Sequence, residues 1–297
     1  MKRKTNSISH KRNMSYMPVI AIALVMFTVF FIIPAVYSFY FSLTDWNGYS
    51  LEYNFIGLDN FVKVFQDVDL LNSVKFTLIY TVAVNATTIP CSIFLAILLT
   101  RKLRGVNFFR AVFFYPAIIS MLSLGLIFNE IFRRMLPMIG ESMGIGFLET
   151  SLLSSKGGAM LAVIILGFWQ NLSIPTVLLI AALQSVPGDL LEAAKVDGAG
   201  PITRFRVVTF PFLASTLVIC LVKGIRDALV VFDYIVSLTQ GGPAKATTSM
   251  GYKIYLMGSM DMKFSQACAT AIVLFVIITI ASFVIMKVVG RGGIEQQ

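Results

Sequence analysis

Charged residues are scarce in this sequence. Of its 297 residues only 13% are charged, whereas 57% are hydrophobic. A typical globular domain is about 25% charged, and a soluble fold of this length could not remove so much apolar surface from water. The composition therefore excludes an ordinary soluble domain and predicts that the chain is surrounded by lipid.

Histidine, cysteine and phosphate-binding motifs are also scarce or missing. The single histidine, His10, lies in a basic N-terminal segment, which excludes histidine catalysis within the apolar part. Cys91, Cys220 and Cys268 lie in apolar stretches without metal-type or disulfide spacing, and we interpret them as small core residues. The dipeptide Gly-Lys does not occur, so the phosphate loop that ends in Gly-Lys-Ser/Thr is absent. We expect the chain itself to bind no metal, no ATP and no other cofactor.

Long apolar runs dominate what is present. A membrane helix needs about 20 mostly apolar residues, and six runs meet this length, at about 18–41, 76–99, 111–132, 159–184, 212–232 and 266–289. The first follows a basic leader, residues 1–17, as a secretion signal would. It is longer than the roughly 7–15 apolar residues of a cleavable signal, so we expect it to be retained. The fold class predicted is an all-α membrane protein with six transmembrane helices over residues 18–290.

The distribution of basic residues predicts the orientation of the spans. The net charge of +9 comes from short clusters beside apolar runs, which is typical of a bilayer protein and not of a nucleic-acid-binding one. Most clusters fall in the leader, in 100–110, in the loop 185–211 and near the tail 291–297. By the positive-inside rule these segments, and both termini, lie in the cytoplasm.

The loop 185–211 has the signals of two short helices. Asp189 follows Pro187-Gly188 and is expected to be a helix N-cap, and strong helix formers follow it. Gly198 suits the left-handed turn that ends a helix, and Pro201 suits the first position of another. The pattern predicts a helix–Gly–helix elbow between two spans.

The composition of the elbow is compatible with two interpretations. Ala193 and Ala194 would let another protein approach the backbone closely, and Glu192 could pair with a partner's arginine in a bidentate manner. Alternatively, the first helix rests on lipid headgroups, although basic residues would then dominate its face. Here acids and bases are equal in number: Asp189, Glu192 and Asp197 against Lys195, Arg204 and Arg206. The residues alone leave both interpretations open.

The same loop resembles a known motif. Its spacing is similar to the "EAA" loop of binding-protein-dependent ABC importer permeases, with conservative departures at two apolar positions; the matching residues are Glu192, Ala193, Ala194, Gly198, Val208, Phe210 and Pro211. Segments 44–46, 55–61, 101–105, 182–187, 232–233 and 241–243 also resemble sugar-importer permeases of the maltose, raffinose and glycerol-3-phosphate type. The resemblance covers about residues 18–290.

This resemblance implies a type I ABC importer permease fold in the bacterial cytoplasmic membrane. It implies carbohydrate uptake, with oligosaccharides foremost, by a subunit that is not itself an enzyme. The implied partners are a second, related permease (usually a different chain), two ATPase subunits that hold ATP and Mg, and an external solute-binding protein. The implied ATPase-coupling residues are Glu192, Ala193, Ala194, Asp197, Gly198, Phe205 and Pro211.

Three charged residues in the fifth run mark a candidate substrate path. Lys223, Arg226 and Asp227 are three and four residues apart, so they are expected to share a helix face. Charges at membrane depth usually face a cavity or a bundle interior. One interpretation is a cavity wall that binds an acidic substrate, such as a sialic acid, a uronate or glycerol-3-phosphate. The other is a Lys223–Asp227 bridge, with Arg226 bonded to a neighbouring subunit.

Two further groups of residues are candidates for substrate or partner contacts. Trp169, Gln170 and Asn171 combine an aromatic face with amides, which suits a sugar, and Asn85 is a further polar residue in a span. The segment after the fifth run is too rich in glycine and proline for a helix. By resemblance it faces the external binding protein; the residues expected there are Asp233, Tyr234, Gly241, Gly242 and Pro243.

Two other classes of function fit the sequence less well. An ion-coupled secondary transporter usually has isolated acids in its spans and paired inverted repeats. Here Asp227 is the one clear mid-span acid, and it has cations beside it. A membrane enzyme would need a metal cluster or a nucleophile–base pair, and the sequence contains neither pattern.

Overall fold

The computed structural model describes residues 17–101 and 104–294, and the side chains of these residues up to 287. Most of the basic leader, Lys102 and residues 295–297 lie outside the described residues. Clustering of contacts divides the chain into two compact units, Met1–Gln66 with Met257–Ile272, and Asp67–Leu256 with Val273–Gln297. In the described part the secondary structure is helical, apart from an isolated antiparallel bridge between Thr44 and Phe55.

Long apolar helices coincide with the expected spans. Five described helices are long and apolar enough to cross a membrane: Met17–Ser42, Val68–Thr100, Lys156–Gln184, Pro201–Leu229 and Phe264–Lys287. A bent pair, Val106–Ala117 with Met121–Met143, makes a sixth crossing if the two are counted together. The chain is therefore a multi-pass helical membrane protein.

The third apolar run differs from the prediction of one helix over 111–132. α5 (Val106–Phe114) runs into a 3-10 turn, η2 (Tyr115–Ala117), and α6 (Met121–Glu130) begins after a bend of 97°. Pro116 lies in this turn, and proline has no N–H with which to continue a helix ladder. Beyond α6 the chain continues through η3 (Ile131–Met135) and α7 (Leu136–Met143), which ends at left-handed Gly144.

The first unit is organised around α2 (Ile33–Ser42), α3 (Asp59–Gln66) and the loop between them. The buried amide of Asn60 donates to the carbonyl oxygens of Ser42 (2.8 Å) and Thr44 (2.7 Å). Hydrogen bonds from the backbone and side chain of Asn54 hold the pKa of Asp45 below its usual value. These polar contacts give the loop a defined structure where the chain leaves α2.

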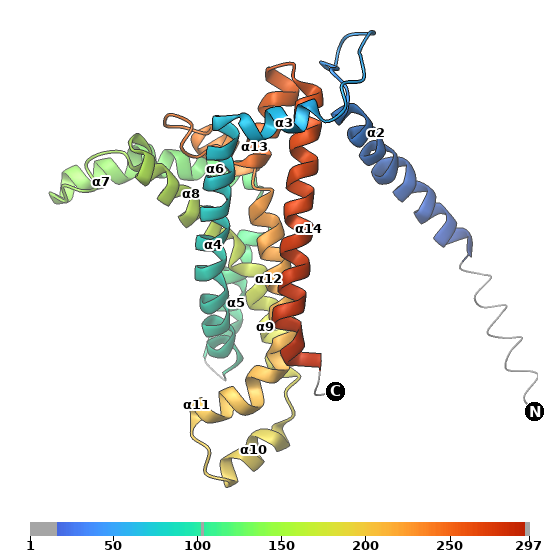
Figure 1. The fold of residues 1–297 in the computed structure, drawn as a ribbon. Helices are drawn as coiled ribbons and strands as arrows, with labels where there is room; N and C mark the ends of the chain where they lie inside the picture. Colours follow the sequence, from blue (N-terminus) through green and yellow to red (C-terminus); the bar gives the residue numbers. More distant parts are fainter. Residues whose placement is uncertain (1–16, 102–103, 295–297) are drawn as a thin grey trace, which may run out of the picture. The chain divides into compact units, whose positions relative to one another are not determined.

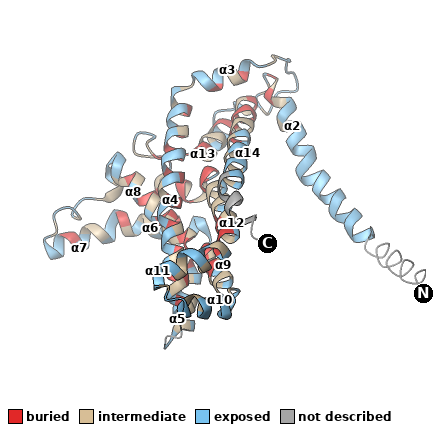
Figure 2. Cartoon of the chain, turned by 60° about the horizontal axis from the view of Figure 1, so that its bottom comes forward, coloured by how far each residue is buried: buried red, intermediate tan, exposed pale blue. Residues whose placement is uncertain are grey.

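The second unit is a bundle in which α4 (Val68–Thr100) packs against α8 (Lys156–Asn171), α9 (Ser173–Gln184) and α12 (Phe210–Leu229). Figure 1 shows these four helices, and buried residues lie along them (Figure 2). The carboxylate of Asp67 caps α4 by accepting the N–H groups of Asp69 (2.8 Å) and Leu70 (3.2 Å). Leu274 of α14 (Phe264–Ile294) packs with Leu229 and with Met250 of α13 (Met250–Tyr255).

Hydroxyl groups inside the bundle bond to the helix that carries them. Thr77 and Thr81 of α4 each donate to the carbonyl oxygen four residues earlier, at 2.7 Å. Thr77 also accepts the N–H of Met250 at 2.9 Å. Since lipid supplies no hydrogen-bond partners, such internal bonds allow polar side chains to lie inside a membrane bundle.

A glycine allows α6 to pack closely against the π-helical segment η6 (Ile235–Thr239). A Cβ atom added to Gly125 would collide with the hydroxyl of Ser237. Next to this contact, the Asn129 amide donates to the carbonyl oxygen of Leu238 at 2.6 Å. The bent third run is therefore fixed to the segment that follows α12.

We expect Gly125→Ala to lower the melting temperature of the purified protein in detergent. The added methyl group overpacks a close contact, which costs about 1–3 kcal/mol. The matched control is Gly157→Ala, because a Cβ there meets nothing within 4 Å. Equal melting temperatures for the two variants would contradict this packing.

Candidate functional site

The loop 185–211 forms the expected helix–Gly–helix elbow. α10 (Gly188–Val196) is followed by Gly198, with φ of 77°, and by α11 (Pro201–Arg204), which continues through η5 (Phe205–Thr209) into α12. Pro187, and not Asp189 as expected, is the N-cap. Asp189 lies in the first helical turn and makes no capping hydrogen bond, although its charge is favourable at that end of the helix dipole.

The elbow is open to its surroundings. No residue of α10 or α11 is buried, and the two helices lie beyond the ends of α9 and α12 (Figure 1). Phe205 packs against the buried cluster that contains Leu179 of α9 and Leu213 of α12. Of the residues with an implied coupling role, Glu192, Ala193, Asp197 and Gly198 are exposed, and Ala194, Phe205 and Pro211 are half-buried.

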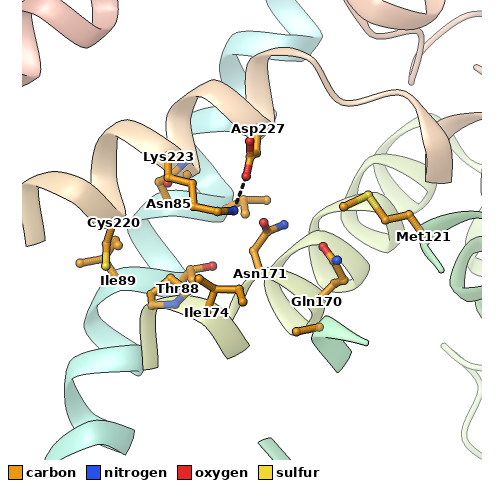
Figure 3. Close-up of a pocket in the computed structure, with 14 residues that line it drawn as sticks. Asn85, Thr88, Ile89, Met121, Gln170, Asn171, Ile174, Cys220, Lys223 and Asp227 are labelled. Atoms are coloured by element: carbon orange, nitrogen blue, oxygen red, sulfur yellow. Dashed lines mark hydrogen bonds and ion pairs between the residues drawn. The ribbon is translucent and has the colours of Figure 1, made fainter. Parts of the chain in front are cut away.

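A cavity of about 230 Å³ lies among α4, α8, α9 and α12, and Ala117 and Met121 of the bent run also line it. Its polar lining comes from Asn85, Thr88, Gln170, Asn171, Lys223 and Asp227 (Figure 3). The structure thus brings together five residues that the sequence proposed for the substrate path, and adds Thr88. Thr88 was missed because threonines are common in apolar helices and the adjacent Thr87 gives no sign of which one faces the cavity.

Some of the polar groups at this cavity have no partner within the chain. The buried hydroxyl of Thr88 and the buried amide oxygen of Gln170 make no hydrogen bond. A buried polar atom without a partner is unfavourable by about 1–3 kcal/mol. By contrast, the Asn85 amide donates to the carbonyl oxygen of Thr81 at 2.8 Å. Both residues line the cavity, although these two atoms are themselves buried.

The three charged residues of α12 do not form the single patch that was expected. Lys223 and Asp227 are joined at 2.5 Å, with side chains 48% and 32% exposed, and both line the cavity. Arg226 is exposed but is not part of this lining. The paired arrangement is one of the two interpretations left open by the sequence.

Trp169 lies on a different side of its helix from the cavity. Its ring packs against Phe128, with centroids 5.6 Å apart. It lines a separate apolar groove with α5 residues such as Val112 and Phe113. Successive helical residues are about 100° apart, so Trp169 points away while Gln170 and Asn171 line the cavity. The three neighbouring residues that were expected to act together therefore do not all line one cavity.

Tyr234 is an interior residue and does not face outward as expected. It is 4% exposed, and its hydroxyl is hydrogen-bonded to that of Tyr80 in α4, which is 0% exposed. Tyr234 also interacts with the side chain of Asn171, which lines the cavity. No local pattern predicts the Tyr80–Tyr234 pair, because its members are 154 residues apart.

The segment after η6 is non-helical, as its glycines and proline predict. Gly241 is buried with φ of 78°, while Gly242, Pro243 and the earlier Asp233 are half-buried. The Thr247 hydroxyl donates to the carbonyl oxygen of Gly242 at 2.7 Å, and Lys245 contacts Asp69 of α4 at 2.5 Å. This segment is thereby tied to the start of α4.

The cysteines fit their interpretation only in part. Cys220 and Cys268 are buried, whereas Cys91 of α4 is exposed. Within the residues that the structure describes, no group of three or more His, Cys, Asp or Glu side chains is suitable for a metal ion.

We expect Tyr234→Phe to destabilise the protein by about 1–3 kcal/mol, because it leaves the buried Tyr80 hydroxyl without this partner. The double variant with Tyr80→Phe should be less destabilised than the sum of the two single variants. Thermal unfolding in detergent measures all three. Additive effects would contradict the hydroxyl pair.

Comparisons with known proteins relate the whole chain to transport systems. The chain is 36% identical over 266 residues to the multiple sugar-binding transport system permease protein MsmF of Streptococcus mutans, covering 90% of this chain and 92% of that protein. It is 32% identical to the probable starch degradation products transport system permease protein AmyD of Thermoanaerobacterium thermosulfurigenes (96% and 97% covered). It is 31% identical to the sn-glycerol-3-phosphate transport system permease protein UgpA of Agrobacterium fabrum (87% and 89%).

Solved structures agree with the fold. A chain of a bacterial ABC transporter involved in the import of the acidic polysaccharide alginate superposes with a TM-score of 0.78 at 20% identity, covering 96% of this chain and 99% of that one. A chain of the bacterial alginate ABC transporter in complex with an alginate pentasaccharide-bound periplasmic protein gives 0.77. A search against family models matched none. The identity to the curated relatives, over nearly their full length, shows that this chain belongs to the permease family of sugar ABC transport systems.

Proposed function

We propose that this chain is the membrane-spanning permease subunit of an ABC importer that takes up a carbohydrate. The observation that carries the proposal is the exposed elbow of α10 and α11, with EAA spacing, in a chain 36% identical to a sugar transport permease. A helix without buried residues, held between two long bundle helices, suits docking to another protein.

The elbow and the cavity share two helices, which provides a mechanical connection. α9 leads into the elbow and α12 leads out of it, and both contribute residues to the cavity lining. Phe205 anchors the elbow to the same two helices. A partner that grips α10 and moves would therefore displace two walls of the cavity together. Two arrangements of these walls would open the cavity to opposite sides of the membrane in turn.

The partners follow from what this chain lacks and what its family uses. The sequence has no phosphate loop, so ATP and Mg would be bound by two separate ATPase subunits, and the chain itself would not be an enzyme. A second, related permease completes the membrane part. The segment 239–249 would face an external binding protein; the alginate transporter crystallised with a sugar-bound periplasmic protein supports such a partner.

The membrane topology is part of the same proposal. Counting the bent pair as one crossing gives six spans and places both termini on the same side. The basic clusters support a cytoplasmic location for the termini and the elbow, where an ATPase would be found. The membrane would be the bacterial cytoplasmic membrane.

Polar groups at the cavity support a sugar as the cargo. Amides, a hydroxyl and a charged pair can donate and accept hydrogen bonds at once, and a sugar presents many hydroxyls. The names of the curated relatives also point to sugars or glycerol phosphate.

Reconstitution tests the proposal directly. The chain, its partner permease, the ATPases and the binding protein are placed in liposomes, and uptake is measured for a panel of neutral and acidic sugars. We expect uptake that requires both ATP and the binding protein. Uptake by this chain alone under a proton or sodium gradient would instead indicate a secondary transporter.

We expect Gly198→Ala to uncouple ATP hydrolysis from transport. A residue with a Cβ atom at φ of 77° costs about 1–2 kcal/mol, so the angle between α10 and α11 would change. In proteoliposomes, sugar uptake per ATP hydrolysed should fall severalfold. The control is Gly188→Ala, where φ is not positive and a Cβ meets nothing within 4 Å. The idea fails if both variants transport equally well.

A further inference from the structure

We propose that the Lys223–Asp227 pair is a specificity element that makes this chain's wall of the cavity select neutral sugars over acidic ones. This inference rests on the proposed function. It concerns the charge of the cargo, which the sequence left open between neutral and acidic sugars.

The pair is positioned to contact a cargo. Both residues project from α12 into the cavity, and Asn171 lies opposite them (Figure 3). The Lys223 ammonium and the Asp227 carboxylate are 2.5 Å apart, and each side chain keeps part of its surface exposed, 48% and 32%. The two charges are therefore bound to each other and are still accessible from the cavity.

The charge of the lining is balanced. Among the described side chains that line the cavity, only Lys223 and Asp227 are charged. Arg226 is not part of this lining. The excess positive charge that an acidic cargo would need is therefore absent from this wall. The remaining polar lining consists of uncharged amides and a hydroxyl.

A paired ammonium and carboxylate suit hydroxyl groups better than an anion. An ammonium has three N–H donors and a carboxylate has several acceptor sites, so each retains hydrogen-bonding capacity after the pair has formed. Neighbouring hydroxyls of a sugar can donate to Asp227 and accept from Lys223 at the same time. A carboxylate on the cargo would have to approach Lys223 beside Asp227, where the like charge opposes it.

Direct binding to the permease–ATPase assembly tests this inference without selection by the binding protein. The assembly is placed in lipid nanodiscs, and saturation-transfer NMR compares glucose with glucuronate and galactose with galacturonate. In the wild type we expect a neutral sugar to bind about tenfold more tightly than its uronate. Asp227→Asn removes the opposing charge, so this variant should bind the uronate at least as tightly as the neutral sugar.

Two control variants separate this effect from a structural one. Glu130→Gln breaks another pair with i,i+4 spacing, Arg134–Glu130, which lies outside the cavity lining, and should leave the binding ratio unchanged. The double variant Lys223→Asp with Asp227→Lys keeps the net charge at zero and should retain the preference for the neutral sugar. If Asp227→Asn fails to assemble, this double variant and the wild type still provide the test.

The outcomes also distinguish this inference from the proposed function. Equal or tighter binding of the uronate by the wild type, an unchanged ratio in Asp227→Asn, or no sugar binding at all would overturn the role of the pair. ATP-dependent uptake of an acidic sugar in preference to neutral ones would do the same and leave the proposed function intact. Failure of the complete transporter to take up any sugar would contradict the proposed function itself.

Discussion

A chain surrounded by lipid must satisfy its polar groups internally, and the rest of this structure depends on that constraint. Backbone groups form their hydrogen bonds within long helices, and the hydroxyls of Thr77 and Thr81 donate to carbonyl oxygens of their own helix. Lys223 and Asp227 satisfy each other. Of the four buried side-chain polar atoms that lack a partner in the described part of the chain, those of Thr88 and Gln170 belong to residues that line one cavity. Together with the charged pair, these two residues give the cavity a polar lining inside an apolar bundle.

The same helices that enclose this cavity carry the exposed elbow outside the bundle. α9 and α12 pack against each other and against α4, so a displacement of one of them at the elbow would be passed to the other along their contact. Phe205 extends that packing to the base of the elbow. On the other side of the cavity, Tyr234 links Asn171 to Tyr80. The cavity is thus connected to both the elbow and the segment after α12 by packed side chains.

Much of this arrangement could be predicted from the sequence because it depends on local patterns. Apolar length located the spans, Gly198 and Pro201 located the elbow, and the i,i+4 spacing allowed the Lys223–Asp227 pair. Other positions depended on geometry between elements, which local patterns do not give. Whether Trp169 faces the cavity depends on which side of α8 meets the bundle. The burial of Tyr234 depends on its hydrogen bond to Tyr80, which is 154 residues away in the sequence. The bend at Pro116 had a local signal, but proline is often tolerated in membrane helices, so its size of 97° was not predictable.

The central claim is that the elbow is the docking site of an ATPase and is joined mechanically to the cavity. Backbone hydrogen exchange, measured by mass spectrometry on the permease with and without the ATPase subunits, tests it most directly. We expect the amides of α10 to gain strong protection when the ATPase is present, and those of the loop between α2 and α3 to remain unchanged. Unchanged exchange throughout residues 188–204 in an assembly that still transports would contradict it.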